Sequence, residues 1–124
     1  MRVDNLKGRW VVVTGAGSGI GRAIALDAAR RGGNVAICDI DAARLKETRA
    51  LLGDYGVDVI ASPVDVANRA QVQKFAALVH EKTPAVDILV NNAGFVIAAD
   101  ILDTTPKDWE FIIGVNLMGV IHFC

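Results

Sequence analysis

Thr14-Gly15-Ala16-Gly17-Ser18-Gly19-Ile20-Gly21 is the stretch that decides the fold. The four residues before it, 10–13, are apolar and three of them are β-branched, which is typical of a buried strand. Residues 22–31 contain neither proline nor glycine, and Gly32 and Gly33 follow them, which predicts a helix that ends there. A glycine-rich turn therefore joins a strand to a helix.

This turn has the properties of a phosphate-binding loop. Its four glycines within residues 15–21 let the backbone adopt positive φ angles and let another molecule approach closely. The N–H groups and the dipole at the start of the following helix attract an anion, as in a dinucleotide pyrophosphate site. No Gly-Lys-Ser or Gly-Lys-Thr follows, which excludes a nucleoside-triphosphate loop. A purely structural turn is the alternative. The predicted cofactor-binding residues of the turn are Gly15, Ser18, Gly19, Ile20 and Gly21.

The composition predicts one domain and argues against several classes of partner. The chain has 124 residues, 52% of them hydrophobic, and a formal net charge of −1. No run of Lys or Arg occurs, so we expect neither nucleic acid nor an anionic membrane as a partner. The apolar runs are too short to span a bilayer, and residues 1–7 do not have the pattern of a signal peptide. Two cysteines, Cys38 and Cys124, make no disulfide framework, so we expect a cytoplasmic location.

Strands and helices alternate along the chain. The predicted strands are 10–14, 34–38, 57–64 and 86–90, and the predicted helices between them are 20–31, 42–52 and one that begins after Asn68. This alternation predicts an α/β fold, a Rossmann-type doubly wound parallel sheet in three αβα layers with strand order 3-2-1-4. Ligands bind beyond the carboxyl ends of such strands, near the switch between the first and fourth strands.

Asp39 ends the second strand, about 20 residues beyond the glycine turn, where this fold contacts an adenosine ribose. A carboxylate there accepts hydrogen bonds from both ribose hydroxyls and repels a 2′-phosphate. Ile40, Asp41 and Ser18 are not basic, so the sequence predicts NAD in preference to NADP, with Asp39 and Ile40 at the cofactor. The alternative is that Asp39 only caps the next helix.

The pattern Thr-Gly-x-x-x-Gly-x-Gly at 14–21, with Asn91-Asn92-Ala93-Gly94 after the fourth strand, resembles the short-chain dehydrogenase/reductase family. The resemblance implies hydride transfer between nicotinamide and a carbonyl or alcohol carbon of a small molecule. It also implies that Asn91 ties neighbouring strands together. The further cofactor-binding residues that it implies are Asp65 and Val66 at the adenine, and Asn92, Ala93 and Gly94 at the ribose.

Asn116 resembles the asparagine of the family's catalytic tetrad, which opens a helical kink and holds a water of a proton relay. An incidental polar residue on a helix is the alternative interpretation. The family's Ser and Tyr-x-x-x-Lys have no match here: Tyr55 is the only tyrosine and is followed four residues later by Val59. The only serines are Ser18, in the glycine turn, and Ser62, in the third predicted strand.

We therefore expect residues 1–124 to be the dinucleotide-binding, amino-terminal part of a longer dehydrogenase, incomplete at its carboxyl end and inactive alone. A naturally short, non-catalytic nucleotide-binding module is the alternative. The resemblance implies a homodimer or homotetramer for the longer protein. His80 and His122 lack metal-ligand spacing, so we predict no metal site. Trp109 is expected in the core.

Overall fold

The structure, a computed structural model, describes residues 5–124, so residues 1–4 of the amino-terminal segment lie outside it. Its sheet has four parallel strands in the order β3-β2-β1-β4, as the sequence predicts. The strands are β1 (Trp10–Thr14), β2 (Asn34–Asp39), β3 (Val59–Pro63) and β4 (Ile88–Val90). β3, at one edge, ends on Pro63, which lacks an N–H group and suits a strand end.

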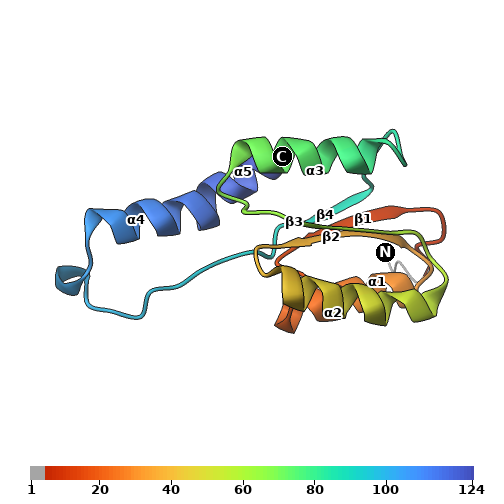
Figure 1. Cartoon of the computed structure of the whole chain (residues 1–124), viewed down its shortest axis with the longest axis horizontal. Coiled ribbons are helices and arrows are strands. Elements are labelled where there is room, and N and C mark those ends of the chain that lie inside the picture. Colours follow the sequence, from red (N-terminus) through yellow and green to blue (C-terminus); the bar gives the residue numbers. More distant parts are fainter. Residues whose placement is uncertain (1–4) are drawn as a thin grey trace.

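Helices cover both faces of this sheet. They are α1 (Gly19–Arg30), α2 (Ala42–Leu52), α3 (Arg69–His80), α4 (Pro106–Ile113) and α5 (Gly119–Phe123). Figure 1 shows α1 and α2 on one face and α3 and α5 on the other, which is the expected three-layer arrangement. In the same view α4 lies outside these layers, beyond the long segment that follows β4. No helix of residues 5–124 is long and apolar enough to cross a membrane.

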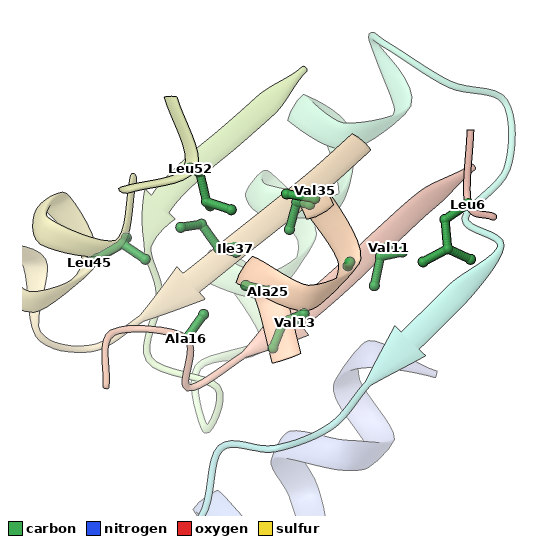
Figure 2. Packing of buried hydrophobic residues seen from close by; sticks show 11 residues of the cluster. Leu6, Val11, Val13, Ala16, Ala25, Val35, Ile37, Leu45 and Leu52 are labelled. Atoms are coloured by element: carbon green, nitrogen blue, oxygen red, sulfur yellow. The ribbon is translucent and has the colours of Figure 1, made fainter. Parts of the chain in front are cut away.

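The two faces of the sheet bury separate apolar clusters, because successive strand residues point to opposite sides. Figure 2 shows the cluster beneath α1 and α2, where Val11, Val13 and Ile37 meet Ala25 and Leu45. The residues that form the opposite cluster, against α3, are Trp10, Val12, Ala36, Cys38, Val64, Val72, Phe75 and Val79. Burial raises the pKa of the Cys38 thiol to about 12, so this side chain is an un-ionised core residue at neutral pH.

Local signals explain most helix boundaries. Asp41 and Asn68 accept hydrogen bonds from the N–H groups of Arg44 and Gln71, so they cap α2 and α3 at the points where the sequence predicts these helices to begin. α2 ends at Leu52, but the chain reverses later, after a 3-10 turn, η1 (Gly53–Tyr55), at Gly56 with φ +66°.

The expectation that Trp109 lies in the core is wrong. Its residue surface is 43% exposed, and its indole Nε1 donates to Thr104 Oγ1 at 2.7 Å. The periodicity of apolar residues in α4 indicates a helix that buries one face, but α4 lies outside the layers that would cover that face.

Asp87 links the start of β4 to β1 through hydrogen bonds. Its Oδ2 accepts from the Trp10 N–H at 2.9 Å, its Oδ1 accepts from Arg9 Nη1 at 2.9 Å, and its own N–H donates to Trp10 O at 3.0 Å. The Trp10 N–H and the Arg9 guanidinium lower the pKa of this carboxyl.

We therefore expect Asp87 to stabilise the fold in a pH-dependent way. Its contribution is present above the ordinary aspartate pKa of about 4 and is lost as the pH falls through the lower folded-state value. Asp87→Asn should reduce the free energy of unfolding at about pH 7 more than at about pH 3, as measured by urea unfolding. Asp54→Asn, in the exposed turn η1, is the control. An equal loss at both pH values would contradict this role.

Candidate functional site

Glycine is required at two positions of the turn because of what packs against it. A Cβ on Gly21 would lie 2.2 Å from Gly15 O, and a Cβ on Gly15, where φ is +63°, would lie 2.9 Å from Ala93 Cα. The turn therefore packs directly on the segment that follows β4. Gly19, with φ +55°, differs, because a Cβ there would meet no atom within 4 Å. Gly19 faces open space.

That space is a cavity of about 420 Å³ at the carboxyl ends of the strands. It brings together every predicted cofactor-binding residue except Gly21, which is turned toward Gly15 O instead. The lining residues are Gly15, Ser18, Gly19, Ile20, Asp39, Ile40, Val64, Asp65, Val66, Asn92, Ala93, Gly94, Phe95, Phe111 and Val115. Sequence reasoning missed Val64, Phe95, Phe111 and Val115. Phe95 directly follows the motif 91–94, so the sequence could have indicated it. Phe111 and Val115 lie on a later helical segment, and nothing in the local sequence predicts that this segment reaches the cavity.

Asp39 lies at the end of β2 and holds the glycine turn in place. Its Oδ2 accepts from the Gly17 N–H at 2.8 Å, and its Oδ1 accepts from the Asp41 N–H at 2.9 Å. The helix-capping alternative for Asp39 is wrong, because Asp41 occupies the N-cap of α2. The Asp39 carboxylate is thus a fixed negative charge on the wall of the cavity.

Asn92 ties β4 to β1. Its N–H donates to Thr14 Oγ1 at 3.0 Å, and its Nδ2 donates to Thr14 O at 3.1 Å and to Gly15 O at 3.2 Å. The Ala93 N–H also donates to Thr14 Oγ1, at 2.9 Å. One hydroxyl and one carboxamide therefore close the junction between the two strands.

The expectation that Asn91 ties the strands is consequently wrong. Its Nδ2 lies 4.0 Å from Cys124 Sγ, after the end of α5, and α5 covers the opposite face of the sheet from α1. Because side chains alternate across an extended strand, Asn91 and Asn92 point to opposite faces, and only Asn92 reaches Thr14. The sequence motif alone does not say which of two adjacent asparagines faces β1.

Asn116 lies in a π-helix, η3 (Gly114–Met118), between α4 and α5. Its Oδ1 accepts from the Phe95 N–H at 2.7 Å, and its Nδ2 donates to Phe95 O at 2.7 Å. Both ends of the carboxamide are thus engaged by one backbone residue in the segment after β4. The irregular helix lies where the family resemblance implies a kink, and π-turns are frequent at functional sites.

The two histidines bind backbone carbonyls. His122 Nδ1 lies 2.9 Å from Val66 O, and His80 Nδ1 lies 3.1 Å from Thr83 O. Within residues 5–124, no three His, Cys, Asp or Glu side chains are grouped so that they could hold a metal ion.

A family model described as short chain dehydrogenase matches residues 9–124. The chain belongs to the short-chain dehydrogenase/reductase family. Among its relatives, the probable oxidoreductase EphD of Mycobacterium tuberculosis is 42% identical over 114 residues, which are 92% of this chain and 19% of EphD.

Solved structures of this family share the fold. A short-chain dehydrogenase/reductase from Burkholderia phymatum in complex with NAD superposes with a TM-score of 0.91 and 39% identity, covering 96% of this chain and 42% of that one. L-sorbose reductase from Gluconobacter frateurii, complexed with NADPH and L-sorbose, superposes with a TM-score of 0.90 and 32% identity. The match covers 97% of this chain and 46% of the reductase chain. This chain thus spans less than half the length of each of these three relatives.

We expect a side chain at position 21 to destabilise the fold. Gly21→Ala would force a methyl group against Gly15 O, and such overpacking costs about 1–3 kcal/mol or more. Gly53→Ala is the control, because Gly53 has φ −59° and open space around it, so alanine there should stabilise by about 0.5–1 kcal/mol. Urea unfolding measures both. Wild-type stability in Gly21→Ala would contradict the close approach.

Proposed function

We propose that this chain is the dinucleotide-binding domain of an NAD-dependent short-chain dehydrogenase/reductase that moves a hydride between nicotinamide and a carbonyl or alcohol carbon of a small substrate. The observation that carries the proposal is the single cavity formed by the glycine turn, Asp39 and residues 92–94. These segments are far apart in the sequence and meet at the carboxyl ends of β1, β2 and β4, where this fold class binds dinucleotides.

The start of α1 suits a pyrophosphate. Ser18 at its N-cap makes no side-chain capping bond, whereas Asp41, Asn68 and Thr105 cap α2, α3 and α4. The first N–H groups of a helix have no partner within it, and a phosphate can accept from them and interact with the helix dipole. The open space at Gly19 leaves room for that group.

The walls of the cavity suit the two halves of NAD. The Asp39 carboxylate would accept from the adenosine ribose hydroxyls, and Ile40 and Val66 would contact the adenine with Asp65 near its amine. The small residues Ala93 and Gly94 would let the other ribose pass close to the backbone, beside Asn92. A 2′-phosphate would meet the Asp39 charge, which favours NAD over NADP.

The reaction also needs groups that these residues lack. NAD, when bound, supplies the hydride chemistry, and the chain supplies its binding and orientation. Asn116 would contribute to the reaction indirectly, by fixing the backbone of Phe95 through two hydrogen bonds. The serine and Tyr-x-x-x-Lys that exchange the alcohol proton in this family have no counterpart in this sequence. We infer that this chain binds the dinucleotide without turning over alcohols.

We expect Gly19→Ala to weaken NADH binding at least tenfold, because the added methyl group projects into the space that the pyrophosphate would fill. Gly56→Ala is the matched control: Gly56 also has positive φ, +66°, and a Cβ there would meet no atom within 4 Å, but it lies in the turn after η1. Both changes carry a similar left-handed backbone penalty of about 1 kcal/mol. Isothermal titration calorimetry on the folded proteins gives the affinities.

Three outcomes of this experiment are informative. Loss of affinity in Gly19→Ala but not in Gly56→Ala supports the pyrophosphate site. Equal affinities in both variants contradict it. The wild-type chain, with its mass of 13.2 kDa verified, is also mixed with NAD and simple secondary alcohols. Formation of NADH would contradict the inference that this chain does not oxidise alcohols.

We expect Asp39 to determine the cofactor preference. Asp39→Asn combined with Ile40→Arg should lower the ratio of NADH to NADPH affinity by about 100-fold, which corresponds to about 2.7 kcal/mol. Asparagine removes the negative charge but keeps an acceptor for the Gly17 N–H, so the turn remains held. Asp41→Asn, at the neighbouring N-cap, is the control and should leave the ratio unchanged. Tighter binding of NADPH than of NADH by the wild type would contradict the role of Asp39.

A further inference from the structure

α2 binds the backbone of the glycine turn on the side away from the cavity. Thr48, in the middle of α2, is fully buried, and its Oγ1 donates to Ala16 O at 2.9 Å. Arg22, in the first turns of α1, donates from Nε to Thr48 Oγ1 at 2.9 Å and from Nη2 to Gly17 O at 2.5 Å. The Arg22–Thr48 pair therefore holds two successive carbonyl oxygens of the turn.

Binding of these two oxygens also fixes the direction of the N–H groups of Gly17 and Ser18. In a trans peptide the C=O and the following N–H point in opposite directions. With Ala16 O bound by Thr48, the Gly17 N–H points the other way and donates to Asp39 Oδ2 at 2.8 Å. With Gly17 O bound by Arg22, the Ser18 N–H is directed away from the Arg22 guanidinium, and Ser18 lines the cavity.

The turn needs such a restraint because of its composition. Because Gly17 has no Cβ, the peptide between Gly17 and Ser18 is less restricted on its Gly17 side than a peptide between two substituted residues. Rotation would present the Gly17 carbonyl oxygen, rather than the Ser18 N–H, to an anion in the cavity. That exchange replaces attraction by repulsion.

Arg22 is suited to this task by its own contacts. Its Nη2 also lies 3.0 Å from Glu47 Oε2 and 3.3 Å from Arg44 O, and its side chain is only 27% exposed. A planar guanidinium can reach several acceptors at once in a fixed geometry, which a lysine ammonium on a flexible stem does not reproduce.

We propose that Arg22 and Thr48 act together as a clamp that fixes the peptide orientation of the glycine turn and thereby sets its affinity for a pyrophosphate group. Both are positioning residues, since they act through the backbone of residues 16–18. The inference rests on the proposed function of the cavity and adds two residues that do not line it.

The test compares two probes on the full 124-residue chain. ADP-ribose contains the pyrophosphate, and adenosine lacks it. Thr48→Val removes the hydroxyl but keeps the shape, and it should weaken ADP-ribose binding about tenfold while changing adenosine binding less than about twofold. Thr48→Ser keeps the hydroxyl and should bind ADP-ribose like the wild type. Calorimetry and NMR titration give the two affinities.

Two further variants separate positioning from general stability. Arg22→Lys, at a partly exposed side chain, should show the same selective loss, and combining it with Thr48→Val should add little, because the two residues act as one unit. Leu52→Ala removes a fully buried side chain of α2 that makes no bond to the turn. It should lower the stability of the chain but leave ADP-ribose affinity of the folded protein unchanged.

The outcomes distinguish this inference from the proposed function. If the wild type does not bind ADP-ribose, both are overturned. If the wild type binds ADP-ribose and the Arg22 and Thr48 variants bind it equally well, only the clamp is overturned. Equal weakening of both probes would also overturn it, because that result shows a general structural role. Selective loss of ADP-ribose, rescued by Thr48→Ser, supports it.

Discussion

The junction between Thr14 and Asn92 is the interaction on which the cavity depends. Thr14 is buried at the end of β1, and its hydroxyl accepts from two successive N–H groups after β4, while the Asn92 carboxamide donates to two carbonyls of the turn. These bonds join segments more than 75 residues apart in the chain. Together with the pairing of β1 and β4, they fix the position of the glycine turn relative to residues 92–94.

Two glycines allow the turn and the segment after β4 to approach closely enough for these bonds to form. Gly15 and Gly21 leave no room for a Cβ, so turn, helix α1 and the segment after β4 come into direct backbone contact. On the other side of the turn, α2 reaches the same backbone through Thr48 and, with Arg22, binds its carbonyls. The turn is thus fixed between two layers of contacts, and the freedom that glycine gives the unfolded chain is removed in the folded one.

How much of this the sequence predicts depends on how local each signal is. The strands, the capped helices and the strand order follow from runs of β-branched residues, from Asp41 and Asn68, and from the right-handed crossover rule. Most residues of the cavity follow as well, because carboxyl ends of parallel strands share one edge.

The features that sequence analysis missed depend on tertiary contacts. Whether Asn91 or Asn92 faces β1 depends on the path of the chain after β4, which ends at Val90 as the sequence predicts. Trp109 has the periodicity of a buried residue, but its helix leaves the layers of the fold. Thr48 looks like an ordinary helix residue in the sequence, and only the fold brings its hydroxyl to Ala16 O.

A single helical segment connects the two ends of the cavity. Asn116 binds the backbone of Phe95 at one end, and a few residues later Gly119 and His122 contact Val66 at the other. Gly119 has no room for a Cβ, which would lie 2.7 Å from Val66 Cγ2. The π-helix η3 closes its hydrogen bonds over five residues instead of four, so its turns are wider than those of an α-helix and the angular offset between Asn116 and Gly119 differs from the regular one. This one segment contacts both walls of the cavity, since Asn116 binds Phe95 while Gly119 and His122 lie against Val66.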